Sequence, residues 1–590
     1  MKNYLLFIID SLNYSHVKDK MSKLMPFCNK IIPESIVCNN MYSQAPYTEA
    51  AVMNIYCGQN VLDNGGYLKR FKDASKTIFE VFKEAGYKTF YNSFQPQCYP
   101  SSLRRGVDEL YYNVGYDLGA LWSYRLSHYA ALLRNEQIKE EDYVILEDIF
   151  EDNFTEWEVF VEKYLAGDKS CEMISANNKA YDANDVLKRV KEQHRLFIEN
   201  KRDYIASVLK EGTSHCLFDI PAYVQDYKIK DDNVRRQLKK LFKPVARKIR
   251  RKDFSYNIKN NKGFAKGTFK RFGKFITHPS KNSLKDFLKS AQFTANIMFD
   301  LDLGSRINKN CDTFKAAPSA RTHIDQYINW AKENRDSNHF ACIHVDDIHN
   351  PEMFFTYDTN DVELLKRERD DAMEVIKSLD KKYKGSITHD LSLRYIDRVI
   401  EYMFSQLKEN GMLDDTCVVI TADHGFSFSA NPVRDTFVTN LYLENYNIPC
   451  IIYNSSKDNF AYDELCTSKD IPATLCDIAF GNVPKEFNGN SILDKHEYSN
   501  LFIEYCGGGC PDLTRRDIKM AAFDKSLFVG TLCDLNKELG DSQITEIYDL
   551  ANDPLQKKNL VNENYNSEEV QKKLEVIINR RRDIVKNSLN

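Results

Sequence analysis

The chain has 590 residues, of which 43% are hydrophobic, 12% aromatic and 28% charged, a composition typical of a globular protein and not of a disordered one. No run of residues approaches the roughly 20 apolar positions that a membrane-spanning helix needs, and the apolar run at residues 4–9 is too short for a signal peptide. The 15 cysteines have no regular spacing, so we expect most of them to be reduced and buried. These features predict a cytoplasmic protein that contacts a membrane only peripherally, at its inner face.

The N-terminal part of the chain contains a predicted strand and a predicted helix that each carry a reactive side chain. Residues 4–9 predict a buried central strand, and Asp10 follows it directly. Pro46 breaks the next segment, Thr48 stands where a helix should begin, and Gly58 is its expected stop. The Thr48 hydroxyl could cap that helix. It could also act as a nucleophile, because the free N–H groups of a helix N-terminus favour an anionic substrate.

Residues from about 120 to 330 differ from the rest of the chain. They are rich in Lys, Glu, Asn, Tyr and Phe at helical spacing, so we expect a large, mostly helical insertion. Between Lys228 and Lys281 there are 19 Lys and Arg against 3 Asp, a charge of +16, which leaves −20 for the remainder of a chain whose total is −4. Pro244 is expected to kink or end a helix here. The apolar residues of this block lie on one helical face or alternate with lysines: Val234, Leu238, Leu241, Val245, Phe264, Phe269, Phe272 and Phe275.

This basic, amphipathic block has several interpretations. A basic helix with aromatic side chains suits an anionic membrane surface. The same charge would suit an acidic glycan or a nucleic acid, and a solvated basic face without a ligand is a further alternative. We favour a peripheral contact of residues 228–281 with an anionic membrane over nucleic acid.

The α/β pattern returns after the insertion. A strand is predicted at residues 340–345, followed by Asp346 and Asp347, with His349 two residues further on. An amphipathic helix is expected at residues 391–407, with Gly411 as its stop. Beyond the next strand, the chain predicts a strand at 449–453, a helix at 470–479, and strands within 519–531 that belong to a small C-terminal subdomain.

The strand predicted at residues 417–421 is followed by Asp423 and His424, and the chain turns at Gly425. The carboxyl ends of parallel strands lie at one edge of an α/β sheet, where such folds place their ligands, so Asp10, Asp423 and His424 are expected to converge. Carboxylates and imidazoles are good ligands of zinc and manganese. An ordinary strand end with a polar turn is the alternative for Asp423 and His424.

Six parts of the chain, in order, resemble the sulfatase branch of the alkaline phosphatase superfamily. They are Asp10 after the first strand, SQAPYTEAAVMNIYCG (Ser43–Gly58), DDIHNP (Asp346–Pro351), GMLDDTCVVITADHG (Gly411–Gly425), SKDIPATLCDIAFGN with FNGNSIL (Ser468–Asn482 and Phe487–Leu493), and EIYDLANDPLQKKNLVN (Glu546–Asn562). The resemblance implies an α/β fold with a central, mostly parallel sheet flanked by helices. We expect a catalytic domain from residues 1–119 and 331–500, a helical, basic insertion at 120–330, and a small α+β subdomain at 501–590.

The resemblance also implies a site. Asp10, Thr48, Asp423 and His424 would hold one divalent metal ion, zinc or manganese before magnesium or calcium, and Thr48 would be the nucleophile. His349 would contact a phosphoryl oxygen or protonate the leaving group, with Asp347 beside it in substrate binding; a hydrogen-bonded turn histidine is the alternative for His349. A second metal would draw on Asp346, Asp347, His344 and His349, which lack the spacing of the two-zinc relatives.

The chain departs from true sulfatases at the nucleophile. Those enzymes carry a Cys or Ser that becomes formylglycine, with Pro and Arg in the next four residues, whereas Thr48 is followed by Glu-Ala-Ala-Val. Threonine cannot form that aldehyde, and a threonine nucleophile is similar to that of lipoteichoic acid synthases, phosphoethanolamine transferases and nucleotide pyrophosphatases.

The chain therefore predicts a metal-dependent phosphotransferase or phosphodiesterase that works through a phospho-enzyme. Its expected substrate is a glycan or lipid-linked glycan that carries a phosphoglycerol or phosphoethanolamine group, in polysaccharide biosynthesis. One alternative is a sulfatase-like hydrolase of sulfuric or phosphoric esters that acts on a small soluble substrate. The other is a non-catalytic relative that uses the pocket only for binding.

Overall fold

The computed structural model describes residues 3–64, 75–93, 104–112, 126, 129–130, 132–134, 136, 138–170, 182–220, 231–260, 262–299, 319–349, 362–379, 387–426, 441–506, 517–534, 542–563 and 567–588. Lys228, Asn350 and Pro351, which belong to segments singled out in the sequence, lie outside these residues. The side chains of Glu49 and Phe264 lie outside them as well.

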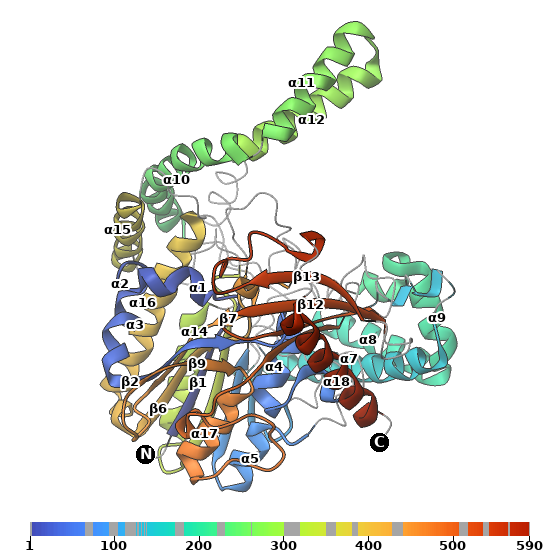
Figure 1. The fold of residues 1–590 in the computed structure, drawn as a ribbon. Coiled ribbons are helices and arrows are strands. Elements are labelled where there is room, and N and C mark those ends of the chain that lie inside the picture. The colour runs from blue at the N-terminus through green and yellow to red at the C-terminus, as the bar shows by residue number, and fades with distance from the viewer. Residues whose placement is uncertain are drawn as a thin grey trace.

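A mixed sheet of nine strands forms the centre of the molecule (Figure 1). β1 is parallel to β5 on one side and to β6 on the other, and β7 and β8 run against the remaining strands. The predicted mostly parallel α/β sheet is therefore confirmed. In spatial order the strands are β4 (Glu109–Tyr112), β3 (Lys88–Ser93), β5 (His339–Val345), β1 (Asn3–Ile9), β6 (Thr416–Ala422), β8 (Cys450–Tyr453), β2 (Ser35–Tyr42) and β7 (Asn447–Ile448), while β9 (Ala461–Thr467) pairs with β2.

The three central strands are buried almost completely, because helices cover the sheet. All residues of β5 and β6 are buried, and in β1 only Asn3 is partly exposed. Strands buried on both faces read as continuous apolar runs, which explains why residues 4–9 and 417–421 were recognisable in the sequence. Two groups of helices contact one another around the sheet: α2 (Met21–Leu24), α3 (Pro26–Ile31), α14 (Ala320–Glu333) and α16 (Ile387–Glu409) in one, and α4 (Thr48–Cys57), α5 (Ile78–Glu84) and α17 (Asp470–Phe480) in the other.

The helix predicted at residues 391–407 is α16, which begins four residues earlier and extends to Glu409. Gly411 lies just beyond it with φ 67°, the left-handed conformation that glycine adopts without strain. Its N–H donates to the Lys408 carbonyl and closes the last turn. Gly411 was therefore correctly predicted as the stop of this helix.

Among the described residues after β4, helices α7 to α12 occupy the region where the helical insertion is predicted. α7 (Glu140–Leu165), α8 (Ala183–Glu199) and α9 (Lys201–Glu211) pack around a core of their own, separate from the core of the central sheet. α10 (Asp232–Asn260), α11 (Lys262–Thr277) and α12 (Lys281–Phe299) follow, and Figure 1 shows α11 and α12 projecting from the body of the molecule. The aromatic centre of the α7–α9 core consists of Phe150, Phe154, Trp157, Phe160 and Phe197.

The apolar face of α10 is not free for a ligand, which differs from the sequence-based interpretation of this helix. Leu238, Phe242 and Ile249 are fully buried, and α10 packs against α15 (Val362–Ser378). Pro244 lies inside α10, so it does not end the helix. The core of the central sheet therefore extends onto α10, whose described apolar side chains between residues 234 and 249 are mostly buried.

A second, antiparallel sheet of four strands lies near the C-terminus, within the residues for which a small subdomain was predicted. Its order is β10 (Leu501–Cys506), β11 (Asp517–Phe523), β12 (Leu527–Asp534) and β13 (Gln543–Asp549). α18 (Glu568–Ser588) packs on it and buries Val570 and Ile577 against Met520 and Ile547. Within the described part of the chain, none of the helices combines the length and the apolar character needed to cross a bilayer.

Candidate active site

Three aspartates directly follow three neighbouring strands that end at the same level. Ile9 of β1 is in register with Val345 of β5 and with Ala422 of β6, so the next residues are Asp10, Asp346 and Asp423. The Asp10 N–H still donates to the Val345 carbonyl at 2.8 Å, which holds its backbone in the ladder. Asp10 and Asp423 are both buried.

Buried imidazoles complete this cluster. Asp10, His344 and Asp423 each present one ligand atom, and these atoms lie within 4.8 Å of one another. Nε2 of His344 is 3.7 Å from Oδ2 of Asp423. Nε2 of His424 is 3.5 Å from the same oxygen and 4.0 Å from Oδ1 of Asp10. The structure therefore brings the predicted Asp10, Asp423 and His424 together and adds His344.

The cluster fits a divalent cation. Two carboxylates buried side by side repel each other unless a positive charge lies between them. No hydrogen-bond donor among the described residues reaches Oδ2 of Asp423, although this oxygen is buried between two imidazoles. A set of carboxylate oxygens and imidazole nitrogens suits zinc or manganese.

The turns after β1 and β6 hold these side chains in place. Ser11 has φ 63°, an uncommon conformation for serine, and its N–H donates to Oδ1 of Asp423 at 3.1 Å. The hydroxyl of Ser11 donates to Asp10. The His424 N–H donates to Oδ1 of Asp423 at 2.7 Å. One oxygen of Asp423 is thus occupied by the backbone, and the other faces the cluster.

The ring of His424 is oriented by its other nitrogen. Nδ1 lies 2.6 Å from the Gly425 carbonyl oxygen, which can only accept, so Nδ1 carries the proton. The lone pair of the neutral ring is then on Nε2, the nitrogen that faces Asp10 and Asp423. Gly425 must be small, because a Cβ atom there would lie 2.4 Å from the Glu444 carbonyl oxygen. This arrangement is the one in which a histidine binds a metal ion.

Thr48 is the first residue of α4 and points its hydroxyl at the cluster. Its Oγ1 is 3.3 Å from Oδ2 of Asp10 and 3.4 Å from Nε2 of His424. The N-cap position belongs to Tyr47, whose side chain makes no capping hydrogen bond. The helix-cap alternative for Thr48 is therefore not what the structure shows, and the hydroxyl lies beside potential metal ligands at the N-terminus of a helix.

His349 and Asp347 lie in the turn that follows β5. Asp347 is buried, and its Oδ2 accepts the Ala320 N–H at 2.9 Å, at the start of α14. The His349 N–H donates to the Asp346 carbonyl at 3.0 Å, and the residue is exposed. Asp347 thus positions α14, while His349 is accessible beside the cluster. Their predicted contacts with substrate remain a prediction.

The electrostatics of the cluster favour the protonation states that bind metal. Burial would raise the pKa of the Asp10 carboxyl, but the nearby imidazole of His349 and the hydrogen bond from the Ser11 hydroxyl help to hold it below its ordinary value. Burial lowers the pKa of His344 despite the nearby carboxylates of Asp423 and Asp10. Asp10 is consequently ionised and His344 neutral near neutral pH, as a metal ion requires of its ligands.

The sequence analysis placed His344 among the donors of a second metal ion. The structure places it against Asp423 in the first cluster, because residue 344 is in register with Ile8 and Thr421, one position before the strand ends. The available signal was His344 itself, a histidine inside a buried and mostly apolar strand. The sequence could not assign it to the cluster, because that assignment depends on the register of β1, β5 and β6.

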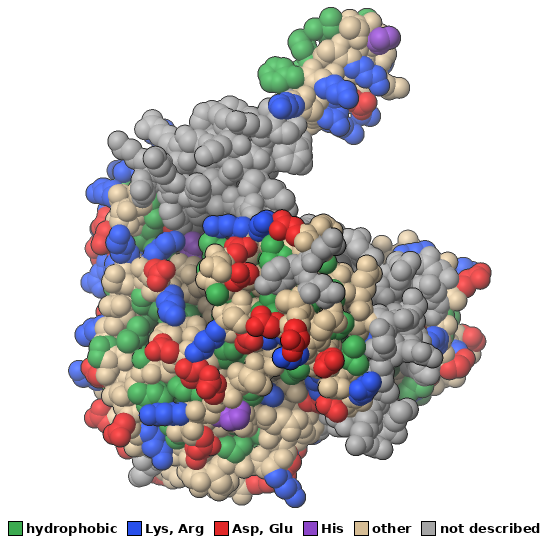
Figure 2. All heavy atoms as spheres, viewed as in Figure 1, with side chains coloured by type: hydrophobic (Ala, Val, Ile, Leu, Met, Phe, Trp, Pro, Cys, Tyr) green, Lys and Arg blue, Asp and Glu red, His purple; other side chains and the backbone are tan. Residues whose placement is uncertain are grey.

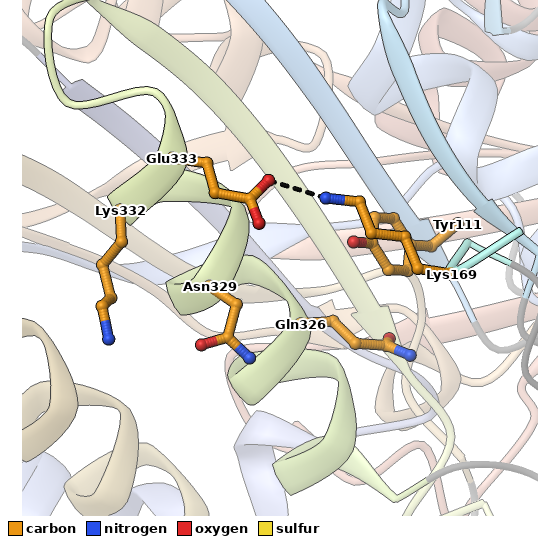
Figure 3. Close-up of a pocket in the computed structure, with 6 residues that line it drawn as sticks. All are labelled: Tyr111, Lys169, Gln326, Asn329, Lys332 and Glu333. Atoms are coloured by element: carbon orange, nitrogen blue, oxygen red, sulfur yellow. Dashed lines mark hydrogen bonds and ion pairs between the residues drawn. The ribbon is translucent and has the colours of Figure 1, made fainter.

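A separate hollow lies beside α14 and contains none of these residues (Figure 3). It has a volume of about 470 Å³ and is lined by Tyr111, Lys169, Gln326, Asn329, Lys332 and Glu333. Lys169 and Glu333 form an exposed ion pair at 2.6 Å across it. Such surface pairs contribute little, and we assign no role in the chemistry to this hollow.

A sequence profile of the sulfatase family matches residues 2–144 and 248–481, more than half of the chain. The chain belongs to the sulfatase family. This sulfatase-family protein is therefore a hydrolase of a superfamily that uses metal ions, and the buried Asp10, His344 and Asp423 cluster is its candidate metal centre. A comparison with the sequences of curated proteins finds no significant match.

Several solved structures are similar to this sulfatase-family chain. A Bacteroides thetaiotaomicron protein described with the metabolism of multiple glycosaminoglycans has 13% identity and a TM-score of 0.49, with 99% of this chain and 96% of that one covered. The phosphonate monoester hydrolase of Silicibacter pomeroyi has 13% identity and a TM-score of 0.49, with coverage of 98% and 95%. A putative sulfatase from Bacteroides fragilis has 12% identity and a TM-score of 0.48, with coverage of 99% and 97%.

Proposed function

We propose that this sulfatase-family protein is a metal-dependent phosphotransferase or phosphodiesterase that uses Thr48 as its nucleophile. The observation that carries the proposal is the position of the Thr48 hydroxyl, 3.3 Å from Asp10 and 3.4 Å from His424 at the N-terminus of α4. The free N–H groups at that helix end favour a phosphoryl group in front of the hydroxyl. Threonine cannot form formylglycine, which argues for a phosphoester over a sulfate ester.

Each residue has a separate part in the proposed reaction. The carboxylate of Asp10 accepts a hydrogen bond from the Thr48 hydroxyl and gives its proton an acceptor. Thr48 Oγ1 then forms a bond to phosphorus, and the bond from phosphorus to the leaving oxygen breaks. His349, accessible beside the cluster, supplies the proton that the leaving oxygen takes up. The oxygen of water or of an acceptor hydroxyl subsequently forms a bond to phosphorus and loses its proton to His349, while the bond between Thr48 and phosphorus breaks and Thr48 regains its proton from Asp10.

A divalent cation bound by Asp10, Thr48, Asp423 and His424, with His344 as a further donor, would lower the pKa of the hydroxyl and screen the charge of the substrate. Zinc or manganese fits this mixed set best. The donors that the sequence suggested for a second cation do not form a second group, since His344 joins the first cluster and Asp347 binds Ala320. We therefore propose a single cation.

The proposed substrate is a glycan or lipid-linked glycan with a phosphoglycerol or phosphoethanolamine group. The charge of +16 in residues 228–281 supports a location of the protein at an anionic membrane, where such lipid-linked substrates are found. The alternative is a hydrolase of sulfuric or phosphoric esters on small soluble molecules. A non-catalytic role is disfavoured, because a binding protein would not need Thr48 beside two metal-binding side chains.

Turnover of two aryl esters, a phosphodiester and a sulfate, tests the proposal. The protein with zinc or manganese should turn over a phosphodiester, with less or no turnover of the matching sulfate, and Thr48→Ala should abolish turnover. Thr77→Ala is the matched control, because Thr77 is a true N-cap that accepts the Glu80 N–H at the start of α5. It should lower thermal stability by about 1 kcal/mol and keep turnover. Diester turnover that survives Thr48→Ala would refute the proposal.

A further inference from the structure

The hairpin formed by α11 and α12 stands away from the body of the molecule (Figure 1). Its two helices are held together along one side. The rings of Phe272 and Phe287 lie 5.0 Å apart, and the Thr268 hydroxyl hydrogen-bonds the hydroxyls of Ser290 and Thr294 at 2.8 and 2.7 Å. The hairpin is thus a structured element with a defined inner face. α12 also contacts α10, and most of the described side chains on the other faces are exposed.

Large apolar side chains are concentrated on those open faces. Phe269 is 75% exposed, Ile276 61% and Leu288 55%. Among the described residues, ten large apolar side chains are exposed, and five of them lie on this hairpin. Scattered exposed apolar residues need no explanation, but a concentration of this kind marks an interaction surface. We call the following residues the docking face: Phe269, Phe272, Ile276, Leu284 and Leu288.

The helical period places the docking face on one side of the hairpin. Phe269, Phe272 and Ile276 follow one another at i, i+3 and i+7 along α11, and Leu284 and Leu288 at i and i+4 along α12. Because the two helices run antiparallel, the two stripes flank the same side of their contact. Figure 2 shows hydrophobic side chains along the upper left edge of the hairpin, with most Lys and Arg side chains on the opposite side.

The charge of the hairpin indicates what this face binds. Residues 266–295 contain seven Lys and Arg and a single acidic residue, Asp286. By the helical period, Lys266, Lys281 and Lys285 border the docking face. An apolar stripe bordered by lysines is typical of helices that lie in the interface of an anionic bilayer, where the apolar side chains enter the headgroup region and the ammonium groups meet lipid phosphates. A protein partner would not call for so uniform a charge.

The described apolar residues of α10, up to Ile249, do not offer a comparable surface. The apolar face of α10 is buried on α15, with Leu238, Phe242 and Ile249 fully inaccessible. α10 therefore connects the hairpin to the body, and most of its exposed side chains between residues 232 and 249 are charged. The sequence alone treated residues 228–281 as one unit, whereas the structure separates a buried connecting helix from an exposed amphipathic hairpin.

We propose that the α11–α12 hairpin docks the protein on an anionic lipid bilayer through its docking face. This proposal adds a membrane-docking surface to the proposed function. It rests on that function in one respect: a lipid-linked substrate would lie at the same membrane surface. The apolar side chains supply affinity, and the lysines supply selectivity for anionic lipid and dependence on ionic strength.

Co-sedimentation with vesicles tests this inference. The full chain should bind vesicles of phosphatidylglycerol and phosphatidylcholine at low salt, bind far more weakly at high salt, and ignore pure phosphatidylcholine. The triple variant Phe269→Gln, Ile276→Gln and Leu288→Gln should bind about tenfold more weakly or worse, because glutamine keeps the helix and removes apolar area. Ile198→Gln is the matched control: Ile198 is 54% exposed on α8, outside the hairpin, and its replacement should leave binding unchanged.

Several outcomes would overturn the inference. They are failure of the wild-type chain to sediment with anionic vesicles, equal binding to neutral vesicles, or unchanged binding of the triple variant with unchanged circular dichroism. If the wild type ignores vesicles and forms dimers that the triple variant does not form, the docking face is an interface between copies. Thr48→Ala must retain vesicle binding. If the wild type binds vesicles but does not turn over the diester, the docking inference holds and the proposed function is refuted. If it turns over the diester but does not bind vesicles, the proposed function holds and the docking inference is refuted.

Discussion

Replacement of His344 by glutamine should weaken the binding of zinc or manganese while the fold persists. His344 is fully buried on β5, and its Nε2 lies 3.7 Å from the Asp423 oxygen that faces the cluster. As a metal ligand, or as the group that orients Asp423 toward one, it should contribute about 10- to 100-fold in affinity. Because cation binding stabilises the folded state, a 30-fold larger dissociation constant removes about 2 kcal/mol of the stabilisation that a saturating cation provides.

The assay is a competition titration with a chelator, together with thermal denaturation in the presence and absence of the cation. His339→Gln is the matched control, because His339 is a buried histidine at the other end of the same strand, hydrogen-bonded to Tyr327 at 3.0 Å. The two histidines are ~17 Å apart along the strand. His339→Gln should lower stability in both conditions and leave the dissociation constant unchanged. Equal affinity of His344→Gln and the wild type, or equal losses in both variants, would refute a metal-binding role for His344.

Three predictions concern two buried carboxylates elsewhere in the fold, Asp397 and Glu504. Asp397 of α16 accepts the N–H groups of Phe27 and Cys28 at 2.9 Å each, so Asp397→Ala should cost about 2–4 kcal/mol in chemical denaturation. Burial raises the pKa of Asp397 to about 6, so the folded carboxyl keeps a proton that the unfolded chain has lost. Stability should therefore fall as the pH rises from about 4 to about 6, and Asp397→Asn should flatten this profile; a slope that persists in the variant would contradict the assignment. Arg580 of α18 hydrogen-bonds the fully buried Glu504, with one bond at 3.1 Å, so Arg580→Ala should cost about 3–5 kcal/mol, and a loss below about 1 kcal/mol would show that the pair is not essential.

The positions of Asp10, Asp423 and His424 could be predicted because they depend on one general property of α/β sheets. Each follows an apolar run, and parallel strands end at a common edge. Thr48 could be placed at a helix start because Pro46 and Gly58 delimit the segment. The predicted fold class is confirmed. It was predictable because strands buried on both faces form continuous apolar runs in the sequence.

The remaining features depend on contacts between distant segments. His344 acquires its meaning from the register of β5 with β1 and β6, over more than 300 residues of separation from Ile8. The apolar face of α10 looks like a free amphipathic surface until α15 is placed against it. Asp347 binds the first residue of α14, which no local pattern indicates. In each case the sequence identifies the side chain, and only the fold shows which distant residue it contacts.

Trapping of the phospho-enzyme tests the central claim most directly. The protein with its cation is mixed with an excess of a phosphodiester substrate, quenched in acid, digested and analysed by mass spectrometry. We expect the peptide that contains Thr48 to carry, on the Thr48 hydroxyl, the phosphoryl group with the ester substituent that the substrate retains, and we expect this adduct to be absent from Thr48→Ala. Turnover without an adduct on Thr48, or an adduct on another residue that persists in Thr48→Ala, would contradict the claim that this hydroxyl is the nucleophile.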